Sequence, residues 1–211
     1  VNITGRGTFT YANNEILRNG DALNKYPWMN SVGQKIYQKF GWEAVGLFES
    51  QEEIDRSPIQ FSEGNHSRLR PGDIKYKDVN GDGIIDSQDR VAIGATTRPN
   101  LIYGFGFSAK WKGLDFNAHF QGAGKSSFFV KGTTVFMFQG GDGWGNVLKE
   151  MAESNRWILG ENEDPNEEFP RLTYGDNKNN YQESNYWLRD GSYLRLKTLD
   201  IGYTFPKAWV N

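Results

Sequence analysis

The chain has 211 residues, a formal net charge of −2 and no cysteine. Its near-neutral charge leaves no electrostatic footprint for nucleic acid, and the absence of cysteine excludes disulfide scaffolds and thiol catalysis. The 25 glycines and the 15% of aromatic residues indicate a loop-rich β architecture. No apolar run approaches the roughly 20 residues that a membrane-spanning helix needs. This criterion does not apply to membrane-spanning strands, in which only alternate residues face lipid.

The first segment alternates apolar and polar residues from the beginning of the chain. The apolar residues Val1, Ile3, Phe9 and Tyr11 occupy odd-numbered positions, and the threonines between them occupy even-numbered positions. This period of two predicts a β-strand near residues 1–13. Because the pattern begins at the first residue, we expect the chain to be a segment of a larger protein.

A long polar region follows at residues 15–99, without a sustained period. A short helix is expected near residues 50–56, where Ser50 caps the N-terminus and Glu53 completes a capping box. A structureless connection of this length is unusual inside a compact domain. We therefore expect this region to be functional or to pack on a partner.

The most specific chemical motif of the chain is DVNGDGIIDSQD at residues 78–89. Its oxygen-bearing residues follow the spacing of an EF-hand calcium loop, and Gly83 permits the tight turn. The last position holds aspartate instead of the longer glutamate, and no amphipathic helix flanks the loop. The motif predicts a structural Ca²⁺ site, and the alternative is an acidic turn that only aids solubility. The expected ligands are the side chains of Asp78, Asn80, Asp82, Asp86 and Asp89 and the carbonyl of Ile84.

The clearest alternation runs through residues 100–111 and 114–122. Only Lys112 and Gly113 separate the two segments, which predicts a hairpin with a two-residue turn. One face is aromatic, and the other carries glycine, hydroxyl, amide and charged groups. The apolar face holds Tyr103, Phe105, Phe107, Phe116 and Phe120, and the polar face holds Ser108, Asn117 and His119.

A second long polar region, residues 123–191, includes a short helix expected within residues 147–158. Its aromatic residues are expected mainly to pack the region against itself, although Trp144 and Trp187 are candidates for contact with a partner or a sugar. Glu161 and Glu163 belong to a solvated charge run. His66 and His119 have no triad or metal-ligand spacing, so no enzymatic site is predicted.

The last strand is predicted near residues 193–205. Leu199, Ile201 and Tyr203 share one parity, whereas Leu194 and Leu196 have the opposite one. A β-bulge near residues 197–198 reconciles the two halves.

The connections between the four predicted strands alternate in length: long, short, long. Bacterial outer-membrane barrels have short periplasmic turns and long extracellular loops, whereas a soluble sandwich has no reason to place both long loops at one end. The sequence therefore predicts an all-β fold, part of an antiparallel transmembrane β-barrel. Residues 15–99 and 123–191 are the expected extracellular loops.

Six blocks in order carry a resemblance to a known family. They are FTYANNEI, KYPWMNSVGQKIYQKFGWEAVGLF, EEIDRSPIQ, RPGDIKYKDVNGDGIIDSQDRVAIG, PNLIYGFGFSAKWKGLDFNAHFQGAG and NYWLRDGSYLRLKTLDIGYTFP. These blocks resemble the C-terminal part of the barrel of SusC/RagA-type TonB-dependent outer-membrane transporters of Bacteroidota.

The resemblance implies a barrel of about 22 strands with a plugged lumen in the bacterial outer membrane. It also implies import of oligosaccharides or peptides, a SusD-like lipoprotein over the outer mouth, and energy from TonB, ExbB and ExbD through regions outside this chain. In that scheme the turn at residues 78–89 is a rigid seat for the lipoprotein.

The competing function is that of a secreted, calcium-stabilised carbohydrate-binding or adhesive β module. The two hypotheses differ in what covers the apolar strand face. It meets lipid in a transporter and a second sheet in a soluble module.

Overall fold

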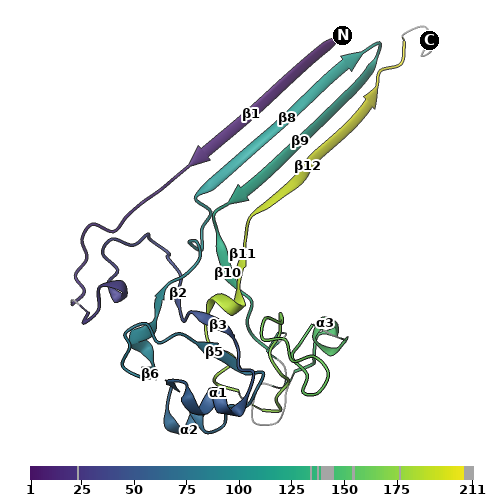
Figure 1. Cartoon of the computed structure of the whole chain (residues 1–211). Helices are drawn as coiled ribbons and strands as arrows, with labels where there is room; N and C mark the ends of the chain where they lie inside the picture. Colours follow the sequence, from purple (N-terminus) through teal and green to yellow (C-terminus); the bar gives the residue numbers. More distant parts are fainter. Residues whose placement is uncertain are drawn as a thin grey trace.

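The computed structural model describes residues 1–22, 24–133, 135–136, 138, 145–153, 155–175 and 177–206. It consists of a sheet of four long strands and a cap built from the two long connections (Figure 1). The cap is defined as the described residues within 12–100 and 125–192. Among the described residues, no helix is long and apolar enough to cross a membrane.

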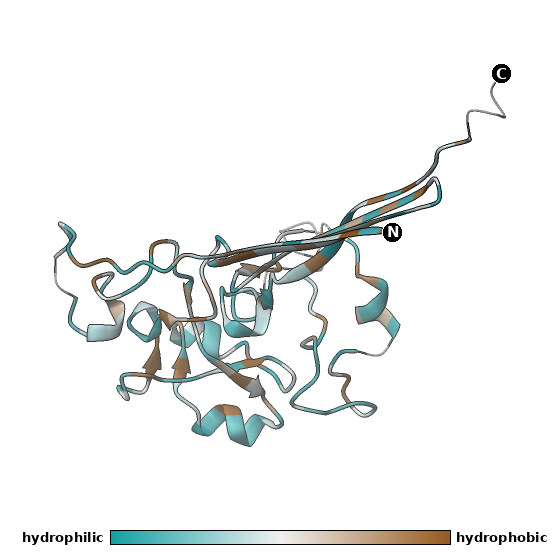
Figure 2. Ribbon diagram, turned by 90° about the horizontal axis from the view of Figure 1, so that it is seen from above, coloured by the Kyte–Doolittle hydropathy of each residue, from teal (hydrophilic) through white to brown (hydrophobic). Residues whose placement is uncertain are grey.

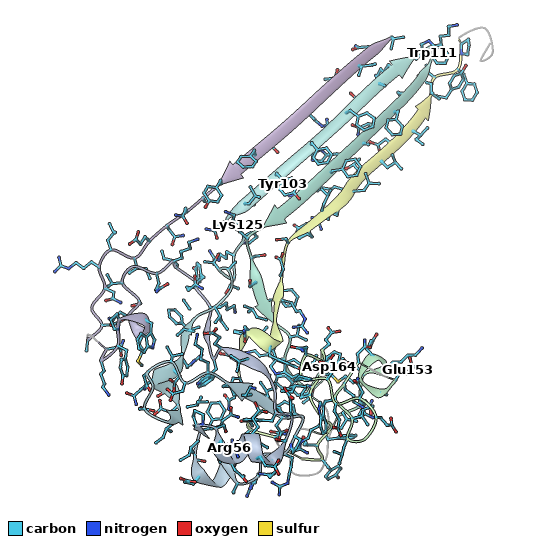
Figure 3. All side chains as sticks on the ribbon, in the orientation of Figure 1. Arg56, Tyr103, Trp111, Lys125, Glu153 and Asp164 are labelled. Carbon is cyan, nitrogen blue, oxygen red and sulfur yellow. The ribbon has the colours of Figure 1, made fainter. Side chains whose placement is uncertain are left out.

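The sheet contains β1 (Asn2–Tyr11), β8 (Leu101–Trp111), β9 (Leu114–Gly124) and β12 (Tyr193–Tyr203). The strand order is β1-β8-β9-β12, and every neighbouring pair is antiparallel, which confirms the antiparallel β-sheet of the predicted fold. Both long connections leave the sheet at one end, and the β8–β9 turn lies at the other (Figure 1). Figure 3 locates Trp111 beside that turn and Tyr103 and Lys125 at the cap end.

The β8–β9 turn consists of the two residues that the sequence predicts. Lys112 and Gly113 have φ angles of 47° and 88°. Positive φ at both central positions belongs to a type I′ turn, whose twist matches that of the flanking strands. A Cβ added at Gly113 would lie 2.7 Å from the carbonyl oxygen of Thr204, so glycine is also required for space.

The two faces of the sheet differ in chemistry, as predicted. The rings of Phe105 and Phe120 stack across β8 and β9 at 5.1 Å, and those of Phe107 and Phe116 stack at 5.4 Å. Phe105 is 45% exposed and Phe107 is 46% exposed, so this aromatic face is uncovered in the chain as it stands. Hydrophobic and hydrophilic residues alternate along the strands in Figure 2.

A β-bulge interrupts β12 where the parity of its leucines changes, which confirms the prediction. The register against β9 shifts between Leu196 and Thr198. Leu196 pairs with Phe120, and Leu199 pairs with Ala118. Because one extra residue is accommodated at the bulge, the leucines on both sides of it reach the aromatic face.

The cap is built from short elements rather than from structureless loops. In the first connection these are η1 (Pro27–Met29), β2 (Phe40–Gly41), β3 (Ala44–Leu47), α1 (Gln51–Arg56), β4 (Ile59–Gln60), α2 (Glu63–His66), β5 (Ile74–Tyr76), β6 (Ile84–Ile85), η2 (Ser87–Asp89) and β7 (Val91–Ala92). In the second they are β10 (Ser127–Phe129), α3 (Lys149–Glu153), η3 (Asn185–Trp187) and β11 (Leu188–Asp190).

Helix α1 begins as predicted, with one difference in its cap. The Ser50 side chain accepts a hydrogen bond from the Glu53 N–H at 3.2 Å. Glu53 Oε2 accepts from the N–H of Glu49 at 2.8 Å instead of from that of Ser50. The predicted capping box is therefore replaced by a bond one residue earlier. The Glu53 carboxylate also pairs with Lys75, which helps to direct it away from the Ser50 N–H.

One apolar core joins both connections. Leu47, Ile74, Tyr76 and Ile85 enter it from the first, and Phe136, Met151, Trp157, Phe169 and Trp187 enter it from the second. Trp157 and Trp187 are only 3% and 1% exposed, which confirms that they pack the region against itself. The expectation that Trp187 contacts a partner or a sugar is therefore wrong, because its surface is already buried. Trp144 lies outside the described residues, and Tyr174 is 77% exposed.

Candidate functional site

A chain of hydrogen bonds crosses the polar face of the sheet. Arg6 Nη2 on β1 donates to Asn117 Oδ1 on β9 at 2.9 Å, and Asn117 Nδ2 donates to Asp200 Oδ2 on β12 at 2.8 Å. Between β1 and β9 lies β8, which presents Gly106 opposite Arg6. A Cβ at Gly106 would lie 2.7 Å from the Ala118 carbonyl oxygen and 3.1 Å from Arg6 Nε. Glycine therefore lets the arginine reach across β8.

The acidic turn at residues 78–89 is organised by its own backbone. Asp78 Oδ1 accepts from the N–H of Gly81 at 2.7 Å, and Asp78 Oδ2 accepts from that of Gly83 at 2.8 Å. Asp82 Oδ1 accepts from the N–H of Ile84 at 2.9 Å. Gly81 and Gly83 have φ angles of 74° and 82°, a region that favours glycine. The glycines thus allow the chain to fold its amides around the carboxylates.

Asp89 closes the turn by linking its two ends. This residue is 0% exposed, and its Oδ1 accepts from the N–H groups of Val79 and Asn80 at 2.8 and 3.3 Å. Its Oδ2 accepts from the N–H of Asp86 at 2.8 Å. Asp86 in turn caps η2 by accepting from the N–H of Gln88 at 2.6 Å.

Two tryptophans hold the turn against the rest of the cap. Trp28 Nε1 donates to the carbonyl of Gln88 at 2.9 Å, and Trp42 Nε1 donates to the carbonyl of Asp86 at 2.8 Å. Both donors are far from the turn in sequence. The turn is therefore a fixed part of the cap surface.

The predicted Ca²⁺ ligands lie in this one turn, but their side chains are engaged with its amides. Among the described residues, no three acidic, imidazole or thiol groups come close enough together to hold a metal ion. The donor chemistry nevertheless fits a hard cation, because each carboxylate oxygen of Asp78 accepts a single N–H and keeps another lone pair. In the described part of the chain, no ion pair involves Asp78, Asp82, Asp86 or Asp89. Four formal negative charges thus lie within twelve residues, and the nearby Lys25 interacts electrostatically with Asp82 and Asp86 without forming an ion pair with either among the described residues.

A buried polar network in the cap escaped sequence analysis. Gln60 Oε1 accepts from the N–H of Tyr76 at 2.7 Å, and Asn180 Oδ1 accepts from the N–H of Ile74 at 2.9 Å. These side chains satisfy an edge of β5 that no strand of the described residues covers. Burial raises the pKa of the Tyr76 hydroxyl, which donates to the carbonyl of Asn179 at 2.8 Å. The only hint in the sequence is the asparagine-rich run at residues 177–180.

The residues considered for catalysis do not come together. Glu163 Oε1 accepts from the N–H of Gly160 at 2.7 Å, and Glu161 is exposed. His66 Nδ1 accepts from the N–H of Gln60 at 3.3 Å in the cap, whereas His119 lies on β9 in the sheet.

Two curated relatives share most of this chain, although no family model matches it. The chain is 32% identical over 175 residues to TonB-dependent receptor P26 of Formosa agariphila, which covers 83% of this chain and 16% of the relative. It is 24% identical over 204 residues to TonB-dependent receptor P3 of the same species, covering 97% of this chain and 17% of the relative. The chain thus spans about a sixth of the length of these relatives.

Solved structures share the fold over nearly the whole chain. A structure of the RagAB peptide importer in the open-open state matches with a TM-score of 0.66 at 20% identity, covering 99% of this chain and 21% of that chain. A structure of the RagAB peptide transporter matches with a TM-score of 0.66 at 19% identity, covering 98% and 21%. Both the sheet and the cap fall within these matches. The relatives show that the chain belongs to the TonB-dependent receptors, and the solved structures show that it has the fold of about a fifth of the chain that it matches in the RagAB structures.

Proposed function

We propose that the chain is part of an outer-membrane channel that imports oligosaccharides or peptides with energy from TonB, ExbB and ExbD. The observation that carries this proposal is a sheet with one uncovered aromatic face and one hydrogen-bonded polar face, with both long connections at the same end. An aromatic face suits lipid and a polar face suits a wet lumen. The outer edges of β1 and β12 are unpaired among the described strands, and backbone groups in lipid must be paired. Further strands of the whole protein therefore close the barrel.

The cap is the extracellular part in this proposal, and a SusD-like lipoprotein docks on it. Long connections lie outside in outer-membrane barrels, and the shared core makes this cap a defined surface instead of a set of mobile loops. The inference that the partner is a SusD-like lipoprotein is based on the family resemblance. The relatives are named as receptors and importers, which supports a non-enzymatic role.

A structural Ca²⁺ is the second part of the proposal. The ion would be held by Asp78, Asn80, Asp82, Asp86, Asp89 and the carbonyl of Ile84. It would neutralise carboxylates that otherwise repel one another and would stiffen the surface on which the lipoprotein rests.

The secreted-module alternative is disfavoured by the sheet. A soluble module needs a second layer over its apolar face. The described residues supply none over Phe105 and Phe107, which are nearly half exposed.

Cysteine labelling in intact cells tests both location and sidedness. The segment has no cysteine of its own. In the full-length protein, Gly64→Cys lies in α2 of the cap, where an added Cβ meets nothing within 4 Å, and Thr204→Cys is exposed beside the β8–β9 turn. A membrane-impermeant maleimide should label the first in intact cells and the second only after lysis. The reverse labelling pattern would contradict the proposed sidedness of the cap. Labelled protein in the culture medium would contradict the proposal that the protein is a membrane channel. Uptake that persists in cells without TonB would contradict the proposed energy source.

A further inference from the structure

The cap contains two hollows of about 430 Å³ each. The first is lined by α2 and the residues that follow it, and by residues 171–179. The second is lined by residues 70–71, 156–159 and 171–172. Arg171 lines both of them, so the hollows are neighbours on one surface.

The second hollow combines arginines with an apolar wall. Arg70, Arg156 and Arg171 line it together with Pro71, Trp157, Ile158, Leu159 and Leu172. No acidic side chain is among these lining residues. Arg70 is oriented by its Nη1, which donates to the carbonyls of Leu69 and Ser67 at 2.6 and 3.2 Å and leaves its other N–H groups available. The hollow is therefore a cationic site with an apolar wall.

Three residues that line this hollow carry a buried N–H group that makes no hydrogen bond among the described residues. They are Arg156 through Nε, Trp157 through Nε1 and Arg171 through Nε, and the last lies 2.9 Å from an Asp73 oxygen in an ion pair. The Arg156 guanidinium also takes part in none of the ion pairs of the described chain. Burying a donor without an acceptor is costly, and such groups call for an explanation. The lining as a whole, with an exposed Arg70, two further arginines and no acidic residue, favours a ligand rich in acceptor oxygens.

Arg171 is held in place between the hollows by a buried carboxylate. Its Nε and Nη2 each lie 2.9 Å from an oxygen of Asp73, which is 1% exposed. Asp73 also accepts from Asn180 Nδ2 at 2.9 Å and from Asn177 Nδ2 at 3.2 Å. Because Asp73 offsets the charge of Arg171, the net positive charge of the second hollow comes from Arg70 and Arg156.

The first hollow adds polar groups, two further cations and an exposed ring. Ser62 and Thr173 contribute hydroxyls, Arg68 and Lys178 contribute charge, and Tyr174 is 77% exposed. Hydroxyl groups both donate and accept, as sugar hydroxyls do, and a tyrosine ring offers an amphipathic contact surface. A peptide commonly binds by adding a strand to a sheet edge, and none of the cap strands lines either hollow. The chemistry favours a charged sugar over a peptide.

We propose that the two hollows form a subsite for an acidic oligosaccharide. Arg70 and Arg156 hold a carboxylate or sulfate of one sugar unit, and the adjoining unit lies in the first hollow beside Tyr174. This subsite rests on the proposed import function and narrows its substrate to an anionic glycan that is captured on the cap before it enters the barrel.

Binding to the full-length transporter with its lipoprotein, purified in detergent, tests the proposal. The test variant is Arg70→Gln with Arg156→Gln, because neither guanidinium has an ion pair in the described chain. Arg171 is left unchanged, since its loss would strand the buried Asp73 charge. The control is Arg56→Gln, the same type of substitution at the exposed end of α1, far from the sheet (Figure 3), which removes one positive charge where the test variant removes two. The probes are oligogalacturonate, a sulfated carrageenan oligosaccharide, neutral maltohexaose and hexaglutamate.

Calorimetry should find that at least one acidic oligosaccharide binds the unmodified protein about tenfold or more tightly than maltohexaose. The double variant should lose about tenfold or more of that affinity, the Arg56→Gln variant should lose none, and added salt should weaken binding. Equal binding of maltohexaose, no binding of either acidic glycan, or an unaffected double variant overturns the subsite. Preferential binding of hexaglutamate would show that the subsite binds an acidic peptide and would contradict the proposed glycan ligand. If these tests fail while TonB-dependent uptake persists, the subsite is wrong and the import function stands.

Discussion

Gln60 Nε2 donates to Asn179 Oδ1 at 2.6 Å across 119 positions of sequence. Gln60 belongs to the first long connection and Asn179 to the second, and both are almost completely buried. The same Nε2 donates to the carbonyl of Ile74 at 3.0 Å, and Asn179 Nδ2 donates to that carbonyl at 2.8 Å. Satisfied polar groups in a low-dielectric core specify one arrangement of their neighbours. The two connections therefore fold as one unit.

Replacing Gln60 with alanine should loosen both connections together. The change leaves the Tyr76 N–H without its partner in the core, at a cost of about 1–3 kcal/mol. It also removes the shorter of two hydrogen bonds to Asn179 Oδ1, which keeps only the 3.5 Å bond from Asn65 Nδ2. Hydrogen exchange on the full-length protein should report faster exchange at residues 74–76 and at residues 177–180. Gln51→Ala, which removes an exposed bond to Asp55, is the control. Faster exchange confined to the first connection would contradict a shared unit.

The sheet was predictable because its signal is local and long. Each long strand has ten or eleven residues, enough for an alternation to be recognised, and the bulge of β12 is visible as a parity change between Leu196 and Leu199. The cap was not predictable for the opposite reason. Its strands have two to four residues, and a segment such as β4 pairs with β6 about 25 positions away, so no periodicity develops.

The two candidate sites differ in the same way. The carboxylates of the acidic turn lie within twelve successive residues, so their spacing was readable before their geometry was known. Arg70, Arg156 and Arg171 come from three distant segments and meet only because the cap core joins the connections. The burial of Trp187 follows the main expectation for the aromatic residues of this region, but the sequence left a surface contact open as an alternative because the neighbours of this residue come from distant segments.

Replacing Gly106 with alanine should weaken the assembled barrel. The added Cβ would lie 2.7 Å from the Ala118 carbonyl oxygen and 3.0 Å from His119 Nδ1. Overpacking of this kind costs about 1–3 kcal/mol, so the barrel should unfold at a lower temperature in gel-shift assays of heated samples. Gly5→Ala on β1 is matched, because nothing lies within 4 Å of its added Cβ. Equal unfolding temperatures for the two variants would contradict the close approach at Gly106.

Replacing Asp82 with alanine should reduce the stiffening of the turn by calcium. If Ca²⁺ is bound there, chelation should increase proteolysis at residues 78–89 in the intact transporter, and the variant should be cleaved equally with and without the ion. Asp55→Ala removes an exposed carboxylate from α1 and should leave the calcium effect unchanged. Calcium-dependent protection that survives in the Asp82→Ala protein would contradict the site.

Deleting Lys197 should leave the facing of β12 unchanged. Lys197 is the extra residue of the bulge, so its removal joins Leu196 directly to Thr198, opposite Phe120 and His119, in an unbroken register. Leu196 and Leu199 then remain on the aromatic face, and the full-length protein should reach the outer membrane in normal amounts in fractionation experiments. Lys197→Ala, which keeps the residue count, is the matched control. A marked loss of the deletion protein from the outer membrane would show that assembly needs the bulge itself, beyond its effect on the facing of the leucines.

The ion-pair cluster around Glu183 should make the stability of the cap depend on pH at acidic values. Lys131 Nζ lies 2.6 Å from Glu183 Oε1, and Arg90 Nη2 lies 3.3 Å from Oε2. The hydrogen bond from Lys131, helped by the charges of Lys131, Arg90 and Lys39 and opposed by partial burial, lowers the pKa of Glu183 below its usual 4.5.

Because the folded pKa is the lower one, the unfolded chain binds the proton more readily, and the stabilisation is fully present above the unfolded pKa. It should be lost as the pH falls from about 4.5 through the folded pKa. The effect should be small, since the Glu183 side chain is 39% exposed and solvent screens the pair. Hydrogen exchange at residues 126–131 and 184–190, followed from neutral to acidic pH, should accelerate in that window. Glu183→Gln should remove that part of the pH response, whereas Glu15→Gln, at an exposed position of the first connection, should retain it. An unchanged response in the Glu183→Gln protein would assign the acid sensitivity of this region to other carboxylates.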